Sequence, residues 1–251
     1  MLEVEGLSKR FGGLAALSEV NLSMKAGEIV SLIGPNGAGK TTCLNLITGF
    51  YKPSAGRVHY CERDITGCAP HAIAQRGLVR TFQKTNVLRG LSVFGNVLTA
   101  RYRQGETSLL RTFFTQGGKR ERELRDEAAA LIETVGLASR MNAAADSLSC
   151  GELRLLEVAV ALGASPRLLM LDEPAAGLNT HEAEQLGQVL KRLMNTHLES
   201  MLLVEHNMAL VMAVSDRIVV LDFGRKIAEG TPAEIRVNPA VVAAYLGKPA
   251  A

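Results

Sequence analysis

The sequence predicts an α/β fold in which a largely parallel sheet is covered by helices. Residues 28–33 form an apolar, β-branched run that suits a buried parallel strand. From residue 167 onward, predicted strands alternate with predicted helices, which is typical of strand–helix–strand units. Between these two parts, residues 124–135 carry apolar side chains at the spacing of one helix face.

The alternation after residue 167 can be assigned element by element. Strands are predicted at residues 168–171, 201–204 and 217–221. Helices are predicted at residues 181–194 and, for a final short helix, at residues 240–246. This order indicates a parallel sheet with helices packed on it.

A smaller antiparallel β region is expected near the N-terminus. Runs that alternate or follow a turn predict strands at residues 2–5, 20–24 and 57–60. The middle of the chain is predicted to be helical, with a surface excursion around residues 103–122. We therefore expect a single domain, residues 1–251, that contains an inserted helical subdomain at roughly 84–165.

Composition and charge restrict the class of protein. The chain has 251 residues, of which 47% are hydrophobic and 21% charged, ordinary values for a globular protein. The formal net charge of +3 argues against a nucleic-acid binder that relies on a broad basic surface. We expect no secretory signal, because the N-terminus lacks the basic start and apolar run of one. We expect no membrane-spanning helix either, because no uncharged apolar run reaches the ~18 residues required. At a membrane, such a protein would have to dock onto other subunits.

The cysteines predict neither zinc binding nor redox chemistry, because no Cys-x-x-Cys pair occurs. Free thiols that serve mainly as packing residues fit a reduced, cytosolic setting. The four cysteines are Cys43, Cys61, Cys68 and Cys150.

One glycine-rich string carries the strongest chemical signal. It matches the pattern GxxxxGK[ST] and lies between the predicted strand at 28–33 and a helix expected to begin near Lys40. Glycines let successive backbone N–H groups point at phosphate oxygens, and a helix N-terminus adds positive partial charge. This context favours a nucleotide-phosphate site over a glycine-rich turn with an unrelated lysine. The string, called the phosphate loop below, consists of Gly34, Pro35, Asn36, Gly37, Ala38, Gly39, Lys40, Thr41 and Thr42.

Several side chains are expected to act on the phosphates and on a metal ion. Lys40 would supply a positive charge to the β- and γ-phosphates, and Thr41 would offer a hydroxyl to Mg²⁺. The predicted strand at 168–171 ends in Asp172 and Glu173. Asp172 would hold the hydration shell of Mg²⁺, and Glu173 would polarise the attacking water as a general base. Acids at a strand end are often merely solvated, but the phosphate loop upstream favours the catalytic interpretation.

Residues 148–152 read Leu-Ser-Cys-Gly-Glu and resemble the signature of the ATP-binding cassette (ABC) family, usually Leu-Ser-Gly-Gly-Gln. The string lies between the phosphate loop and the Asp-Glu strand and heads a predicted helix, which is the order in that family. The resemblance covers nearly the whole chain. It implies a P-loop NTPase with a RecA-like core, an antiparallel β subdomain and an inserted helical subdomain.

The resemblance also implies roles for residues outside the phosphate loop. Gln83, in Thr-Phe-Gln, resembles the glutamine that contacts Mg²⁺ or water. His206 resembles the histidine that contacts the γ-phosphate, although a lone histidine after a strand is more often structural. Phe11 is placed like the aromatic residue that stacks on adenine, with core packing as the alternative. Ser149 and Gly151 would act on the ATP of a partner cassette.

Longer strings narrow the resemblance to the LivG-type ATPases of branched-chain amino acid importers. They are residues 80–83, the excursion around 103–122, and residues 172–179, 229–235 and 244–247. The signature helix departs from that family, which usually carries Gln and several arginines there. Fewer positive groups near the partner's nucleotide would weaken γ-phosphate stabilisation or ATPase rate. The departures are Glu152, Leu153, Leu155 and Val160, whereas Arg154 and Glu157 are kept and Cys150 stands at a position that varies in the family.

The resemblance implies an ATP-hydrolysing subunit in which two cassettes close head-to-tail around ATP and Mg²⁺. Gln83 would relay this closure to the membrane subunits. The implied partners are two membrane-spanning permease subunits, a second, paralogous cassette and, indirectly, a solute-binding protein, with no nucleic acid. The chain would lie peripherally on the cytoplasmic face of the inner membrane. The sequence leaves open the transported substrate and whether the pair of cassettes is homo- or heterodimeric.

Other functions are open alternatives at this point. Related systems take up urea, amides or aromatic acids, and the ATPase itself never touches the cargo. The ATPase of lipopolysaccharide export shares the Gly-Thr-Pro-x-Glu-Ile ending, but the 103–122 excursion and Phe82-Gln83 argue against it. A non-transport ABC protein acting on DNA or ribosomes would usually carry two cassettes or long coiled coils. The signature helix and His206 disfavour a simple P-loop kinase.

Overall fold

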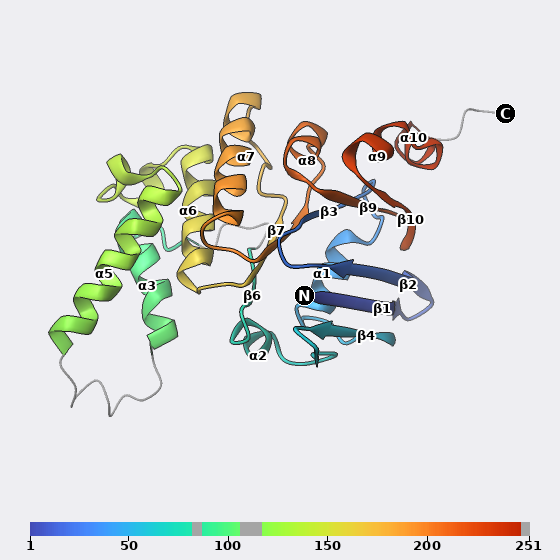
Figure 1. Cartoon of the computed structure of the whole chain (residues 1–251), viewed down its shortest axis with the longest axis horizontal. Coiled ribbons are helices and arrows are strands. Elements are labelled where there is room, and N and C mark those ends of the chain that lie inside the picture. Colours follow the sequence, from blue (N-terminus) through green and yellow to red (C-terminus); the bar gives the residue numbers. More distant parts are fainter. Residues whose placement is uncertain (82–86, 106–116, 247–251) are drawn as a thin grey trace. The chain divides into compact units, whose positions relative to one another are not determined.

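The structure, a computed structural model, describes residues 1–81, 87–105 and 117–246 (Figure 1). The chain forms two compact units. The first unit consists of Met1–Arg80, Arg167–Pro174 and Leu198–Ala251, and the second of Thr81–Pro166 and Ala175–His197.

A six-stranded sheet lies at the centre of the first unit. Its strands are β3 (Ile29–Ile33), β6 (Leu78–Arg80), β7 (Leu168–Asp172), β8 (Ser200–Val204), β9 (Arg217–Asp222) and β10 (Arg225–Gly230). They lie in the order β10-β9-β3-β8-β7-β6, and every pair is parallel except that of β9 with β10. The strands β3, β7 and β8 are buried along their whole length, as expected when both faces are covered. The predicted parallel sheet is therefore confirmed.

Helices and a second sheet cover the two faces of this sheet. The helices of the first unit are α1 (Lys40–Ile47), α2 (Pro70–Ala74), α8 (Met208–Val214), α9 (Pro232–Val237) and α10 (Pro239–Leu246). Alternate residues of β9 point to opposite faces. Val219 joins the core that contains Leu44 of α1, whereas Val220 joins a separate core with Val211 of α8 and Ile235 of α9.

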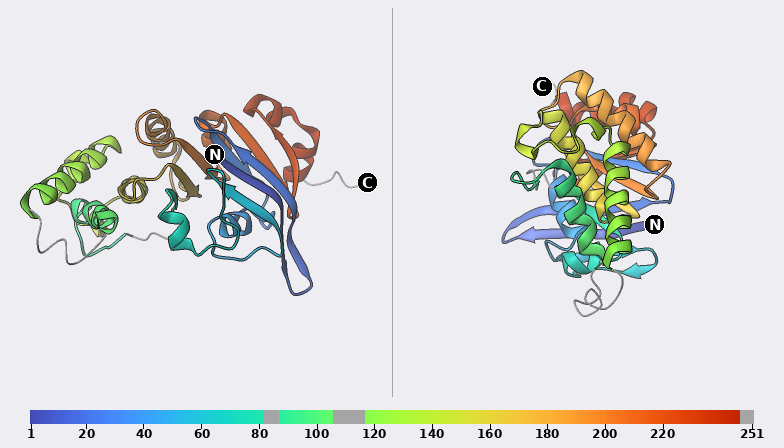
Figure 2. Two further views of the ribbon diagram at one scale, coloured as in Figure 1. Left: turned by 60° about the horizontal axis from the view of Figure 1, so that its bottom comes forward. Right: turned by 90° about the vertical axis from the view of Figure 1, so that its left-hand side faces the viewer.

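The second sheet is antiparallel, in the order β2-β1-β4-β5. Its strands are β1 (Leu2–Phe11), β2 (Leu14–Met24), β4 (Ala55–Tyr60) and β5 (Arg63–Asp64). They contain the three predicted N-terminal strands but extend further, because β1 and β2 form one long hairpin that pairs from Leu2↔Met24 to Phe11↔Leu14 (Figure 2, left, in blue). Gly12 supplies the positive φ of 55° that the tight turn between them requires.

The second unit is helical. It contains α3 (Val93–Gly105), α5 (Gly117–Thr134), α6 (Cys150–Gly163) and α7 (Thr180–Met194), with short 3₁₀ turns at Ala138–Arg140 and Ala145–Ser147. Helix α3 packs beside α5 (Figure 2, right) and against α6, and α6 packs on α7. Helix α6 approaches α3 so closely that a Cβ on Gly163 would lie 2.8 Å from that of Ala100.

The predicted helix at 124–135 corresponds to the later part of α5, which begins at Gly117 and ends at Thr134. The expected helical insertion at 84–165 lies among the residues of the second unit, which also includes Ala175–His197. The division of residues 1–251 into one domain with such an insertion stays a prediction. Part of the expected surface excursion, residues 106–116, lies outside the described residues. In the described part of the chain, no helix is long and apolar enough to span a membrane.

Candidate nucleotide-binding site

The phosphate loop, the Asp-Glu pair and His206 gather at one edge of the six-stranded sheet. The phosphate loop follows β3, His206 follows β8, and Asp172 and Glu173 stand at the end of β7. These three strands are neighbours and parallel, so their carboxyl ends meet at the same edge. This edge is where open α/β sheets place their ligands. Arg80 ends β6, the next strand along.

Glycines shape the phosphate loop for steric reasons. Gly34, Gly37 and Gly39 have φ angles of 151°, 81° and 101°, a region that other residues rarely adopt. A Cβ on Gly34 would lie 2.1 Å from the carbonyl oxygen of Leu221, and one on Gly39 would lie 2.9 Å from that of Ala16. The loop can therefore pass so close to the neighbouring backbone only with glycine at positions 34 and 39.

Lys40 is the first residue of α1 and is buried at the loop. Its Nζ donates hydrogen bonds to the carbonyl oxygens of Gly34, at 2.7 Å, and Pro35, at 3.0 Å. Burial lowers the pKa of Lys40, and the nearby carboxylates of Glu173 and Asp172 act in the opposite direction. The ammonium group is thus curled against the loop, where a phosphate group would meet it.

The other side chains of the loop differ in exposure. Asn36 and Thr41 are exposed, Thr42 is half-buried and Ala38 is buried. Thr41 and Thr42 belong to the first turn of α1, which contains no acidic residue. This end of α1 therefore offers backbone N–H groups and hydroxyls to an anion, with no carboxylate in that turn to repel it.

Glu173 adopts a backbone conformation that is unusual for its residue type. Its φ is 51°, in the left-handed region, and its backbone N–H donates to the carbonyl oxygen of Val204 at 2.8 Å. Such strain in a non-glycine residue is found often at functional sites. His206 approaches from the next strand, with its Nδ1 4.0 Å from Oε2 of Glu173. The structure therefore brings the predicted base and the predicted γ-phosphate contact together.

A fully buried carboxylate holds the turn that presents His206. Oε2 of Glu205 accepts hydrogen bonds from the backbone N–H groups of His206, at 2.7 Å, and Asn207, at 2.9 Å. Asn207 in turn caps α8 by accepting from the N–H of Leu210 at 3.1 Å. Glu205 has no sequence-predicted role, and an acid directly before the histidine is the signal that could have found it.

Phe11 lies on the surface, at the end of β1, with 43% of its area exposed. Its ring makes an edge-to-face contact with Tyr51, with centroids 5.4 Å apart and planes at 79°. Nζ of Lys9 lies 5.1 Å from the centre of the Phe11 ring. This exposure does not fit the alternative of a core residue. Tyr51 was not predicted from sequence, although the adjacent aromatic residues Phe50 and Tyr51 could have drawn attention.

The signature residues belong to the second unit. Ser149 is exposed and caps α6: its Oγ accepts from the N–H of Glu152 at 3.2 Å, and the carboxylate of Glu152 accepts from the N–H of Ser149 at 2.8 Å. A Cβ on Gly151 would lie 3.0 Å from the carboxylate oxygen of Glu182 on α7. A larger residue at 151 would therefore require the Glu182 side chain to shift.

Thr41, Gln83 and Asp172 are the residues predicted to act on Mg²⁺. Gln83 lies outside the described residues, together with Phe82. Among the residues that the structure does describe, no group of three or more His, Cys, Asp or Glu side chains could hold a metal ion. Thr41 and Asp172 offer hard oxygen donors of the kind that Mg²⁺ prefers, and further ligands would come from phosphate oxygens and water.

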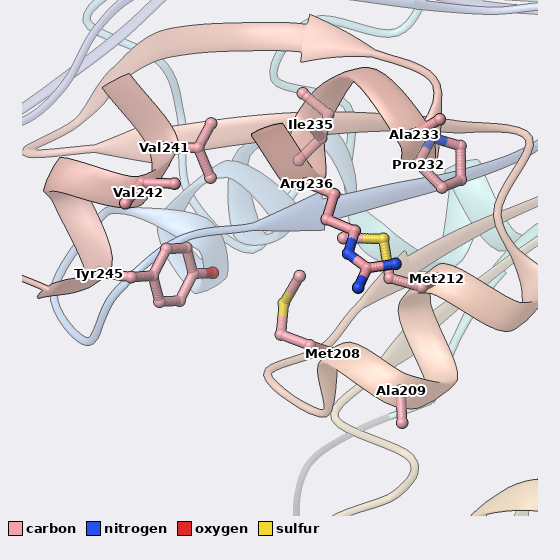
Figure 3. A pocket seen from close by; sticks show the side chains of 10 residues that line it. All are labelled: Met208, Ala209, Met212, Pro232, Ala233, Ile235, Arg236, Val241, Val242 and Tyr245. Atoms are coloured by element: carbon pink, nitrogen blue, oxygen red, sulfur yellow. The ribbon is translucent and has the colours of Figure 1, made fainter. Parts of the chain in front are cut away.

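A pocket of about 690 Å³ lies in the first unit between α8, α9 and α10 (Figure 3). Its lining is almost entirely apolar, so it does not suit phosphate groups. Tyr245, on α10, borders it and is hydrogen-bonded to the backbone of Gly34, the first residue of the phosphate loop. Burial raises the pKa of Tyr245, and this hydrogen bond acts in the opposite direction. The lining residues are Met208, Ala209, Met212, Pro232, Ala233, Ile235, Arg236, Val241, Val242 and Tyr245.

The parallel sheet, with a glycine-rich loop at the end of β3 and two acids at the end of β7, defines a P-loop nucleotide-binding protein. The family model "ABC transporter" matches residues 17–176, and the chain belongs to this family. A second model, "Branched-chain amino acid ATP-binding cassette transporter", matches residues 225–251. The resemblance inferred from the sequence is therefore confirmed.

Known proteins resemble the chain over its whole length. The high-affinity branched-chain amino acid transport ATP-binding protein LivG of Salmonella typhimurium is 46% identical over 250 residues, covering 99% of this chain and 98% of LivG. An ATP-binding cassette of an ABC transporter, solved in its ADP conformation, superposes with a TM-score of 0.86 at 32% identity, covering 99% of each chain. A dimeric cassette in a post-hydrolysis state, bound to ADP and Pi, has a TM-score of 0.77 at 25% identity, covering 92% of this chain and 99% of that one.

Proposed function

We propose that this chain is the ATP-hydrolysing subunit of an ABC importer and that it energises uptake of branched-chain amino acids. The observation that carries the proposal is the meeting of the phosphate loop, the Asp172-Glu173 pair and His206 at the ends of three adjacent parallel strands. The names of relatives such as LivG support the class of cargo, as does the family model matched at residues 225–251.

ATP would bind to the first unit through groups on separate loops. The backbone N–H groups of the phosphate loop and the ammonium of Lys40 would hold the phosphates. Phe11 would stack on the adenine base, since its ring is exposed at the end of β1. Thr41 and Asp172 would hold Mg²⁺, with Gln83 as a further contact. When bound, Mg²⁺ would neutralise charge on the phosphate oxygens.

Hydrolysis would use the groups at the ends of β7 and β8. Glu173 would accept a proton from the attacking water, and His206 would contact the γ-phosphate. The 4.0 Å between Nδ1 of His206 and Oε2 of Glu173 supports this arrangement, because both side chains can then face one small region. Glu205 would keep His206 in place through the two backbone hydrogen bonds that it accepts.

The signature would serve a second cassette. Ser149 is the N-cap residue of α6 and Gly151 lies in its first turn, where the N-terminus of the helix favours an anion such as the partner's γ-phosphate. The dimeric relative bound to ADP and Pi supports such a pair. The remaining partners would be two permease subunits and a solute-binding protein, with the cassette on the cytoplasmic face of the inner membrane.

Nucleotide titration tests the first part of this proposal. Lys40→Ala should abolish tight ATP binding, because an unpaired phosphate charge costs several kcal/mol. Lys191→Ala is the control, since Lys191 is an exposed lysine on α7. Unchanged affinity in the Lys40 variant would show that the phosphate-loop assignment is wrong.

The cargo is tested in the assembled transporter. The chain is co-purified with its permease and second-cassette subunits, reconstituted in vesicles and supplied with the solute-binding protein that co-purifies. ATP-driven uptake of leucine, isoleucine or valine is expected, and Lys40→Ala should remove it. Uptake of urea, an amide or an aromatic acid in place of these amino acids would assign a different cargo to the same ATPase.

A further inference from the structure

A buried guanidinium lies beside the carboxylate that is proposed to act on Mg²⁺. Arg80 is the last residue of β6, and its side chain is only 5% exposed. Its Nη2 donates to Oδ2 of Asp172 at 2.8 Å, and the side chain of Asp172 is 4% exposed. The strands β6 and β7 are parallel neighbours, so this ion pair joins the ends of adjacent strands. None of the hydrolytic steps proposed above uses Arg80.

The same guanidinium is also bonded to α1. Its Nη1 donates to Oδ1 of Asn45 at 2.6 Å and to Oγ1 of Thr48 at 3.3 Å. Asn45 lies within α1, and Thr48 is the C-cap residue of that helix. Because α1 begins at Lys40 and Thr41, Arg80 links the helix that carries one proposed Mg²⁺ contact to the strand that carries the other.

Stability alone is a poor explanation for a charge pair at this depth. Removing two charges from water costs about as much as their attraction returns, so a buried ion pair is weak evidence for stability. A guanidinium, in contrast, is rigid and planar, and it can direct several donors at fixed angles. Arg80 uses this geometry to hold two elements at once.

We propose that Arg80 is a positioning residue that fixes Asp172 relative to α1, so that Asp172 and Thr41 can serve the same Mg²⁺–nucleotide complex. The inference rests on the proposed function, because it gives Asp172 and Thr41 the roles assigned there. Arg80 itself touches neither the nucleotide nor the metal ion. Its contribution is to Mg²⁺-dependent affinity and not to affinity for the nucleotide alone.

The test compares nucleotide affinity with and without the metal ion. ADP and a non-hydrolysable ATP analogue are titrated into the purified chain in excess Mg²⁺ and in excess EDTA. The metal dependence is the dissociation constant in EDTA divided by the dissociation constant in Mg²⁺. Arg80→Gln should lower this ratio about tenfold, the scale of a lost hydrogen bond to a charged group, and should leave affinity in EDTA within about twofold. Arg80→Lys keeps the charge but not the fork of donors, so it should give an intermediate ratio.

A matched control separates positioning from a general loss of stability. Arg217 lies in the same unit and also bridges two elements, because its Nη1 and Nη2 pair with Glu229 and Glu28. It stands at the beginning of β9, opposite the beginning of β3, and so at the other end of the sheet from the phosphate loop. Arg217→Gln should lower the thermal unfolding midpoint and leave the metal dependence unchanged.

Two results would overturn the proposal. One is an Arg80→Gln variant with a lower unfolding midpoint but unchanged metal dependence. The other is an Arg80→Gln variant with a stronger metal dependence, because Arg80 would then act only as a positive charge that opposes Mg²⁺. If Arg80→Gln does not fold, Asn45→Ala decides, because it removes one anchor of the guanidinium and keeps its charge. The Asn45 variant should lower the ratio severalfold, and an unchanged ratio there refutes the idea. Absence of Mg²⁺-dependent binding in the unaltered chain would instead reject the proposed function.

Discussion

Phe11 illustrates, at the scale of single residues, how exposure changes the interpretation of a side chain. A phenylalanine in a strand of alternating pattern is usually a core residue. In this chain β1 ends at Phe11, beside the turn at Gly12, and the ring lies against Tyr51 and under Nζ of Lys9. An exposed aromatic ring with a lysine beside it suits the face of a base with phosphates attached.

Phe11→Ala is expected to weaken nucleotide affinity by about 1–3 kcal/mol, the usual contribution of base–aromatic stacking. Little stability should be lost, because the ring lies on the surface and not in the core. The measurement is a nucleotide titration paired with chemical denaturation. Leu14→Ala is the control, since Leu14 is an exposed residue directly opposite Phe11 in the hairpin. Normal affinity together with lower stability would favour a structural role for the ring.

The residues of the site differ in how far sequence could predict them. The phosphate loop could be placed because its spacing encodes its chemistry, and the structure puts it between β3 and α1 as expected. Arg80 belongs to a string that resembles the family, but the sequence predicts no role for it, because its contacts depend on strand order. Strand β6 lies beside β7, which is distant in the sequence, and Arg80 pairs with Met170. The hydrogen bond of Tyr245 to Gly34 depends in the same way on where α10 packs.

At the scale of elements, the capping box at the N-terminus of α6 explains how the signature accommodates glutamate at position 152. Glutamate stands at 152 where the general signature has glutamine, and both residue types complete a capping box. Glu152 does so here through its bond to the N–H of Ser149, and it also forms an ion pair with Arg140 at 3.0 Å. The change from glutamine therefore preserves the cap of the helix.

Glu152→Ala is expected to destabilise the chain by about 1 kcal/mol, because half of the capping box is lost. Glu152→Gln should stay within about 0.5 kcal/mol of the unaltered chain, since glutamine can accept the same hydrogen bond and the partly exposed pair with Arg140 contributes little. Denaturant unfolding measures both changes. Glu184→Ala, an exposed site within α7, serves as the control. A large loss in the Gln variant would mean that the charge pair, and not the cap, holds this turn.

The elements were predicted best where periodicity and end signals agree. The predicted helix at 181–194 corresponds to α7, Thr180–Met194, which begins after the capping residue Asn179. The final predicted helix, 240–246, begins one residue earlier, at Pro239. The N-terminal strands are longer than the sequence predicts, because their outer residues are partly exposed and carry no clear alternation. The pairing of the long hairpin, and not local pattern, sets their length.

At the scale of the whole molecule, the proposed catalytic groups are divided between two compact units. Lys40, Asp172, Glu173 and His206 belong to the first unit, whereas Ser149 and Gly151 belong to the second. In a head-to-tail pair of cassettes, each ATP would meet the first unit of one chain and the signature of the other. If the partner is a different chain, the two sites of the assembly differ in composition, and one substitution affects them unequally.

Glu173→Gln is expected to separate chemistry from binding in such an assembly. The substitution keeps the size of the side chain and its capacity for hydrogen bonds, but it removes the base. ATP should still bind and still join the two cassettes, whereas hydrolysis at the site built on Lys40 of this chain should fall by roughly 10²–10⁴-fold. Asp172→Asn is the informative comparison, because it should also weaken Mg²⁺-dependent binding.

The Glu173 variant is measured in the complete transporter, by steady-state ATPase activity and by the nucleotide that remains bound after washing. With a paralogous partner, Glu173→Gln should silence one of the two sites, so nucleotide should be trapped at that site only. With two copies of this chain, both sites should stop. The substitution removes the carboxylate whose Oε2 lies 4.0 Å from Nδ1 of His206 at the ends of β7 and β8. Unaltered turnover at the site built on Lys40 would refute the assignment of Glu173 as the base.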